Sequence, residues 1–144
     1  MTMEIQKQES ISAAAKIIVQ SRYTIALVGA GLSVGSGIPT FRGAGGLWTK
    51  LGEPSNNGYE NFLADPKAWW DQNLNAKIDP ERTEFREAIE KAKPNPGHLA
   101  LVDLEKICVL KHQITQNIDN LHYVAGSKKI TEIHGNRTKL RCVG

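Results

Sequence analysis

The chain alternates between blocks with helical hydrophobic periodicity and short runs of apolar residues. The first block, residues 10–21, predicts a helix with Ser10 as its N-cap. One face of this helix carries the apolar side chains Ile11, Ala14, Ala15 and Ile18. Apolar runs at residues 24–28, 107–114 and 129–133 predict three strands, the first of them buried. A short helix at about 120–125 separates the last two.

The middle of the chain, from about residue 55 to residue 93, has the pattern of several helices. Pro66 begins one of them, and Asp79 followed by Pro80 is the cap-and-first-turn signal of another. Pro94 ends that second helix, because proline cannot continue it.

Asn95 and Pro96 repeat the start signal for a helix that runs to about Lys106. The predicted strands at 24–28, 107–114 and 129–133 are therefore separated by helices. Strands separated by helices are typical of a parallel sheet, so we expect an α/β fold.

The composition excludes several classes of protein. Of 144 residues, 40% are hydrophobic, 23% charged and 6% aromatic, which excludes a disordered tail, a collagen-like repeat and a disulfide scaffold. The net charge of +3 is small and the basic residues are not clustered, so we expect no nucleic-acid partner. We expect no membrane partner either, because no apolar run approaches the roughly 20 residues that span a bilayer. The N-terminus lacks a signal-peptide pattern.

The two cysteines fit a reduced, intracellular chain, and we expect a cytoplasmic protein. Cys108 lies in the apolar run at 107–110 and is predicted to be a small buried residue. Cys142 is the third residue from the end of the sequence.

Residues 29–46 hold seven of the 13 glycines, which predicts a loop with a helical turn inside it. Gly29, Ala30 and Gly31 directly follow the first predicted strand, and backbone without side chains can direct its N–H groups at a pyrophosphate. The dinucleotide fingerprint expects another glycine where this chain has Val34. The glycine spacing alone leaves open a tight strand-to-helix turn that binds nothing.

Three ordered segments carry recognisable motifs. GAGLSVGSGIPTFRG spans residues 29–43, TQNIDNLH spans 115–122, and IHGN spans 133–136. Together they resemble the sirtuins, the NAD-dependent protein-lysine deacylases, whose GAG-x-S-x-x-SGIP-x-FR-G segment is matched at every fixed position. The likeness runs from about residue 10 to the last residue, and Cys142 stands where relatives place their first zinc cysteine.

The resemblance implies a Rossmann-like sheet that binds NAD. The NAD-binding residues it implies are Gly29, Ala30, Gly31, Ser33, Ile38, Phe41, Arg42, Gln116, Asn117, Ile118, Asp119 and His134. In this reading Asp119 binds the nicotinamide carboxamide with help from the Ile118 backbone, and Gln116 contacts a ribose hydroxyl. From the residues alone, Asn117 and Asp119 follow a strand and point the same way, but turn formation or helix capping is the favoured explanation for both.

Two residues of the first motif have chemistry that suits this pocket. The Arg42 guanidinium can neutralise phosphate charge. Phe41 can keep water away from a reactive electrophile, or it can be an ordinary core aromatic.

Four histidines occur, and one of them follows the third predicted strand. A neutral imidazole at that edge suits a general base near pH 7, and the resemblance makes His134 the catalytic base. It also implies that Asn117 orients a water or the ribose hydroxyls. We expect His98 and His112 to be structural or exposed, and His122 to support packing.

The implied activity is NAD-dependent protein-lysine deacetylation. The acyl group of a modified lysine passes to ADP-ribose, nicotinamide is released, and NAD is consumed as a co-substrate. The implied partner is therefore an acylated-lysine protein or peptide.

A closed structural zinc site needs four ligands, and the chain supplies one thiolate for it, Cys142. We therefore expect residues 1–136 to be the N-terminal part of a Rossmann-like NAD-binding domain with a helical insertion at about 48–93. Residues 137–144 would begin a truncated zinc-binding module. The sheet would be incomplete, and the isolated chain need not be active.

Three other functions stay open on the sequence. One is a non-catalytic NAD-binding or interaction module. Another is a mono-ADP-ribosyltransferase, which shares the cleavage of NAD. The third is a dehydrogenase, against which Val34 and the lack of an acidic residue about 20 positions downstream both count.

Overall fold

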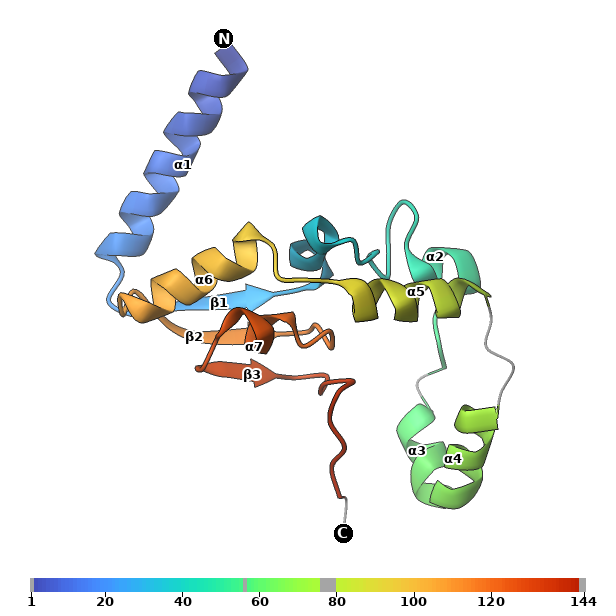
Figure 1. Cartoon of the computed structure of the whole chain (residues 1–144). Helices are drawn as coiled ribbons and strands as arrows, with labels where there is room; N and C mark the ends of the chain where they lie inside the picture. The colour runs from blue at the N-terminus through green and yellow to red at the C-terminus, as the bar shows by residue number, and fades with distance from the viewer. Residues whose placement is uncertain (1, 56, 76–79, 143–144) are drawn as a thin grey trace. The chain divides into compact units, whose positions relative to one another are not determined.

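The structure is a computed structural model that describes residues 2–55, 57–75 and 80–142 (Figure 1). The chain divides into two compact units. Met1–Ser36 and Lys93–Gly144 form the first, which contains the sheet, and Gly37–Ala92 form the second, which is helical.

The sheet of the first unit has three parallel strands in the order β1-β2-β3. They are β1 (Thr24–Val28), β2 (Leu110–Thr115) and β3 (Ile130–Glu132). Val28 pairs with Thr115, and Thr115 pairs with Glu132, so the three strands end at the same level. The predicted strands and the parallel α/β sheet are confirmed. Residues that follow the strands therefore meet at one carboxyl edge.

One helix packs on the sheet and a second helix packs on the first. They are α6 (Pro96–Lys106) and α7 (Leu121–Ala125), and α6 contacts both β2 and α7. The core between these elements contains Val102, Leu110 and Leu121, which are all at most 4% exposed. Burial of these side chains stabilises the unit, at roughly 1.5–3 kcal/mol for each fully buried aliphatic side chain.

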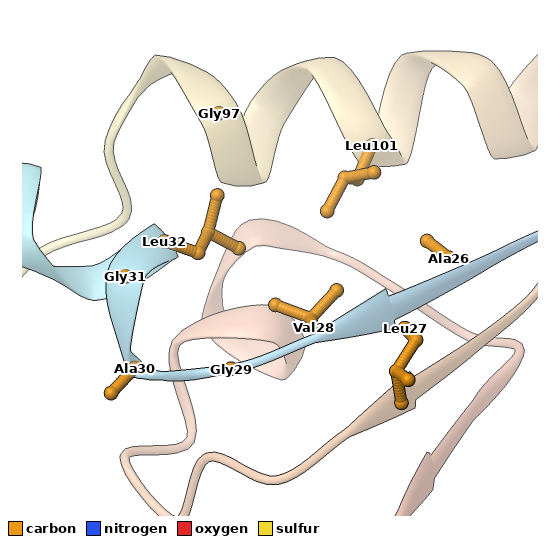
Figure 2. A pocket seen from close by; sticks show the side chains of 9 residues that line it. All are labelled: Ala26, Leu27, Val28, Gly29, Ala30, Gly31, Leu32, Gly97 and Leu101. Atoms are coloured by element: carbon orange, nitrogen blue, oxygen red, sulfur yellow. The ribbon is translucent and has the colours of Figure 1, made fainter.

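The prediction of a buried first strand holds for one face of β1 only. Val28 is 8% exposed, whereas Ile25 and Leu27 are 51% and 69% exposed. Alternate residues of a strand point to opposite faces, and Figure 2 shows Leu27 pointing away from α6. The prediction was wrong for Ile25 and Leu27 because α6 lies over the face that carries Val28.

The first helix, α1 (Thr2–Gln20), is longer than predicted. Ser10 is not its N-cap: it lies inside the helix and donates its hydroxyl to the carbonyl of Gln6 at 2.9 Å. Residues 4–9 are mostly glutamate, glutamine and lysine, whose straight side chains favour helix, so the helix extends past the serine. The predicted apolar face is not a core face, since Ile11 is 52% exposed and only Ile18 is half-buried.

Cys108 is exposed, which contradicts the prediction that it is buried. The strand begins at Leu110, and residues 107–109 belong to the end of α6 instead. Cys108 has a φ of 60°, its N–H donates to the Glu105 carbonyl at 3.0 Å, and the N–H of Val109 donates to the Leu104 carbonyl at 3.0 Å. This is a Schellman ending, in which the residue after the cap adopts left-handed backbone.

The second unit consists of short helices. They are α2 (Leu47–Leu51), α3 (Gly58–Ala64), α4 (Pro66–Asn75) and α5 (Pro80–Lys91). The predicted starts at Pro66 and Pro80 are confirmed, while Asp79, the predicted cap, lies outside the described residues. Phe85 and Ile89 of α5 are buried. No helix among the described residues is long and apolar enough to cross a membrane.

Candidate functional site

A buried hydrogen bond joins the glycine loop to the end of β2. The loop after β1 folds into a short 3-10 helix, η1 (Ala30–Ser36), which buries Ser33 completely. The Ser33 hydroxyl donates to Oδ2 of Asp119 at 2.6 Å, and the N–H of Leu121 donates to Oδ1 at 2.9 Å. Asp119 is 8% exposed, so these two donors satisfy a carboxylate that is nearly removed from water.

Asn117 lies beside this pair and ties it to the start of the loop. Its Nδ2 donates to the carbonyl of Gly29 and to Oγ of Ser33, both at 3.1 Å. The Asn117 N–H donates to Oγ1 of Thr115 at 3.0 Å, which fixes the turn after β2. The structure thus brings Ser33, Asn117 and Asp119 together, as expected for residues at one carboxyl edge.

The glycine loop borders a hollow of about 500 Å³ between β1 and α6 (Figure 2). Its lining residues are Ala26, Leu27, Val28, Gly29, Ala30, Gly31, Leu32, Gly97 and Leu101. A methyl group at Gly31 would meet nothing within 4 Å, so the backbone there is open to a ligand. A hollow of this volume is in the range of small-molecule sites, and it lies directly beside the glycine loop.

Asn95 holds η1 against the start of α6, a role that the sequence did not reveal. Its Oδ1 accepts from the N–H groups of Gly97 and His98 and caps α6. Its Nδ2 donates to the Leu32 carbonyl at 2.7 Å and to Oγ of Ser36 at 3.0 Å. The Asn-Pro signal predicted the cap, but the bonds to Leu32 and Ser36 cross about 60 residues and have no local pattern.

Two buried histidines interact electrostatically with the Asp119 carboxylate. His98 and His122 are 0% and 3% exposed, and their ring centroids are 5.2 Å apart in an edge-to-face arrangement. Burial lowers the pKa of both imidazoles, and the charge of Asp119 opposes that shift. The N–H of Asn95 donates to Nδ1 of His98 at 3.3 Å, so Nδ1 is unprotonated and the proton sits on Nε2. The expected packing role of His122 is consistent with its burial.

His134 follows β3 by two residues and is exposed. The N–H of Ile133 donates to the Thr115 carbonyl at 3.0 Å, and the N–H of Arg137 donates to the Ile118 carbonyl at 3.1 Å. These two bonds flank His134 and hold its segment beside the loop that carries Asp119. The segment therefore lies at the same carboxyl edge as Ser33, Asn117 and Asp119, which together are called the buried cluster.

The remaining residues predicted at this edge differ in exposure. Gln116 is exposed, and its N–H extends the ladder by donating to the Val28 carbonyl at 2.9 Å. Ile118 is half-buried, and its carbonyl accepts from Arg137.

Ile38, Phe41 and Arg42 belong to the second unit. Ile38 is 5% exposed, and Phe41 packs against Trp48 and Phe85 with ring centroids 4.8 and 5.2 Å away. Phe41 is therefore part of an aromatic cluster, one of the two roles considered for it.

Arg42 is exposed and paired within its own unit. Its Nε donates to Oε1 of Glu53 at 2.6 Å, and its guanidinium carbon lies 4.7 Å from the centre of the Trp48 ring. The hydrogen bond and charge of Glu53 raise the pKa of Arg42, and Arg42 in turn lowers the pKa of Glu53. Arg42 thus presents a permanent positive charge that already has an anionic partner.

Known proteins share the segment that contains these residues. The sequence profile of the Sir2 family matches residues 29–144. The chain belongs to the Sir2 family. The resemblance to the sirtuins in the sequence motifs is thereby confirmed.

Two curated relatives are similar to most of this chain. An NAD-dependent protein deacetylase of Caldivirga maquilingensis is 45% identical over 130 residues, which are 90% of this chain and 47% of the relative. An NAD-dependent protein deacylase of Thermococcus kodakarensis is 46% identical over 131 residues, with the same two coverages of 90% and 47%. The chain spans about half the length of the curated relatives it matches.

Solved Sir2 structures share the fold. A Sir2 variant with a deacetylated peptide and 3′-O-acetyl ADP-ribose has a TM-score of 0.65 at 37% identity, over 88% of this chain and 47% of that chain. A variant of a Sir2 homologue in complex with ADP-ribose has a TM-score of 0.61 at 40% identity, over 83% and 44%. The Rossmann-like character of the three-stranded sheet and its flanking helices follows from this similarity.

The zinc module of the Sir2 prediction is not seen in the described residues. Cys142 is exposed, and no group of three or more histidine, cysteine, aspartate or glutamate side chains in the described ranges is placed to hold a metal ion. A structural zinc site needs four ligands, so the described residues do not fit a zinc ion by themselves.

Proposed function

We propose that this Sir2-family chain takes part in NAD-dependent deacetylation of protein lysines. The observation that carries the proposal is the 2.6 Å hydrogen bond from Ser33 to Asp119. It joins the first two sirtuin motifs across 86 residues and places a buried carboxylate beside the glycine loop. The names of the relatives, NAD-dependent protein deacetylase and deacylase, support the same activity.

The buried cluster is suited to hold the nicotinamide end of NAD. When bound, NAD supplies the ADP-ribose that receives the acyl group, and nicotinamide leaves. In the proposal Asp119 accepts a hydrogen bond from the carboxamide, because a carboxylate fixed by Ser33 and the Leu121 N–H has a set orientation. Gly29, Ala30 and Gly31 offer backbone N–H groups to the pyrophosphate. Gln116 and the Ile118 backbone are the proposed contacts to the ribose and carboxamide.

His134 is the proposed general base. An imidazole exposed at the carboxyl edge can accept a proton from a ribose hydroxyl. Asn117 is proposed to orient the water or hydroxyl that reacts, from its fixed position between Gly29 and Ser33. By the motif resemblance, Arg42, Phe41 and Ile38 are further proposed cofactor-binding residues.

The substrate, metal and location belong to the same proposal. The proposed partner is an acylated-lysine protein or peptide, which fits the deacetylated peptide in one similar Sir2 structure. Cys142 is a proposed zinc ligand that requires three further ligands. A cytoplasmic location is proposed from cysteine usage and is tested by cell fractionation.

The test is nicotinamide release by the purified protein, with and without an acetyl-lysine peptide. We expect release that depends on the peptide and is lost in His134→Ala, while NAD binding by calorimetry is retained. Binding of NAD with no release would indicate a non-catalytic module. Release with ADP-ribose transferred to the peptide would indicate a mono-ADP-ribosyltransferase.

A further inference from the structure

The turn that carries His134 is exposed, and residues 133–135 bury no side chain. β3 ends at Glu132, and the N–H of Gly135 donates back to the Glu132 carbonyl at 3.2 Å. Gly135 has a φ of +77°, a left-handed conformation that glycine adopts at little cost. His134 therefore stands on an exposed reverse turn, where its own burial does not fix its direction.

The side chain of Asn136 closes this turn and uses its full hydrogen-bonding capacity. Its Nδ2 donates to Oε1 of Glu132 at 2.6 Å and to Oδ1 of Asn120 at 2.8 Å. Its Oδ1 accepts from the N–H and the hydroxyl of Thr138 at 2.9 and 2.7 Å. Both amide hydrogens and the carbonyl oxygen have partners, so the orientation of the amide is determined.

Glu132 makes this arrangement stiffer than a neutral turn. Its side chain is only 12% exposed, and its other oxygen accepts from Nζ of Lys139 at 3.1 Å. A hydrogen bond to a carboxylate is stronger than one between neutral groups. The carboxylate therefore anchors the Asn136 amide from the side of β3.

Asn120 connects the His134 turn to the loop that carries Asp119. It follows Asp119 directly and has a φ of 66°, the left-handed conformation that starts α7. The hydrogen bond from Asn136 to Asn120 thus crosses from the His134 turn to the residue next to the buried carboxylate.

We propose that Asn136 and Asn120 are positioning residues that hold the His134 turn at a fixed place relative to Asp119. This inference rests on the proposed function, in which His134 removes a proton and Asp119 binds the carboxamide. A proton transfer depends steeply on distance, and a misplacement of about 1 Å can reduce a rate by about 100-fold. Neither asparagine needs to touch the substrate to have this effect.

The sharpest variant is Asn120→Gly, measured in the protein at its natural length. Glycine adopts the left-handed backbone of Asn120 at little cost, and it removes the side chain that carries the acceptor oxygen. We expect kcat for nicotinamide release with an acetyl-lysine peptide to fall about 10-fold to 100-fold, while KM for NAD changes less than about threefold. Asn136→Ala should do the same. The matched control, Lys106→Gln, breaks the exposed ion pair between Lys106 and Asp103 on α6 and should stay within about twofold of the parent.

A double variant separates positioning from general destabilisation. If Asn120 acts through His134, then Asn120→Gly lowers the residual rate of His134→Ala by less than about twofold, because the base is already gone. An unchanged kcat in Asn120→Gly, or equal losses with and without His134, overturns the inference while leaving the proposed function intact. A parent protein that releases no nicotinamide overturns the proposed function and the inference with it.

Discussion

Removal of the Ser33 hydroxyl tests how much the hydrogen bonds of the buried cluster contribute to stability. The hydroxyl is completely buried, donates to Oδ2 of Asp119 at 2.6 Å and accepts from Nδ2 of Asn117 at 3.1 Å. In Ser33→Ala the Asn117 amide keeps its bond to the Gly29 carbonyl, but Oδ2 of Asp119 loses its donor. A hydrogen bond to a charged group contributes about 1.5–3 kcal/mol, so we expect the free energy of unfolding to fall by that amount.

Urea unfolding at pH 7 measures this loss. With a slope of about 1–3 kcal/mol per molar urea, the midpoint should move down by roughly 1 M. Ser10→Ala is the matched control, because the Ser10 hydroxyl is exposed and bonds only within α1. Its midpoint should not fall. A loss in Ser33→Ala below about 0.5 kcal/mol would mean that the bond to Asp119 does not hold the loop to the sheet.

Three further predictions concern the groups around this cluster. Burial lowers the pKa of His98 and His122, so the unfolded chain takes up protons that the folded protein excludes, and stability should fall as the pH drops below about 6.5. Urea midpoints measured between about pH 5 and 8 give this pH dependence of stability. The variant His122→Phe should make stability depend less on pH. An equally steep dependence in the variant would assign the loss of stability to other groups. Glu53→Gln removes the anionic partner of Arg42, whose Nε lies 2.6 Å from Oε1 of Glu53. KM for NAD should then fall roughly two- to fourfold in the nicotinamide-release assay. A higher KM would contradict the proposal that Arg42 binds a phosphate of NAD. Asn95→Ala removes the α6 cap and two long-range bonds, and should cost about 1–3 kcal/mol of unfolding free energy by urea titration; a cost near zero would show that η1 does not depend on it.

Local patterns were sufficient for the sheet and for the residues that follow it. The run at 24–28 ends in a glycine loop, and the run that ends at Thr115 leads into Asn117 and Asp119. Parallel strands bring their carboxyl ends to one edge, so the meeting of Ser33, Asn117 and Asp119 follows from the order of the elements. Their hydrogen-bond partners do not follow from that order, because they depend on side-chain positions across more than 80 residues.

The sequence predictions were wrong where a run of residues was compatible with two different local structures. Cys108 continues an apolar run, yet the ending of α6 takes it into left-handed backbone and out of the sheet. Ile25 and Leu27 have the composition of a buried strand, but composition does not say which face a helix covers. Asn136 stands in the third motif without any signal of its own, and its hydrogen bond to Asn120 becomes apparent only when β3 lies beside the end of β2.

Tracing the acyl group addresses the assignment of this edge most directly. The purified protein is incubated with NAD and a peptide whose acetyl-lysine carries a carbon-13 label in the acetyl group, and the products are separated by mass spectrometry. We predict that the label appears on ADP-ribose, in amounts equal to the nicotinamide released, and that Asp119→Asn and His134→Ala each reduce this product at least about tenfold. Label found only in free acetate, or ADP-ribose found on the peptide with its acetyl group intact, would contradict acyl transfer at the carboxyl edge.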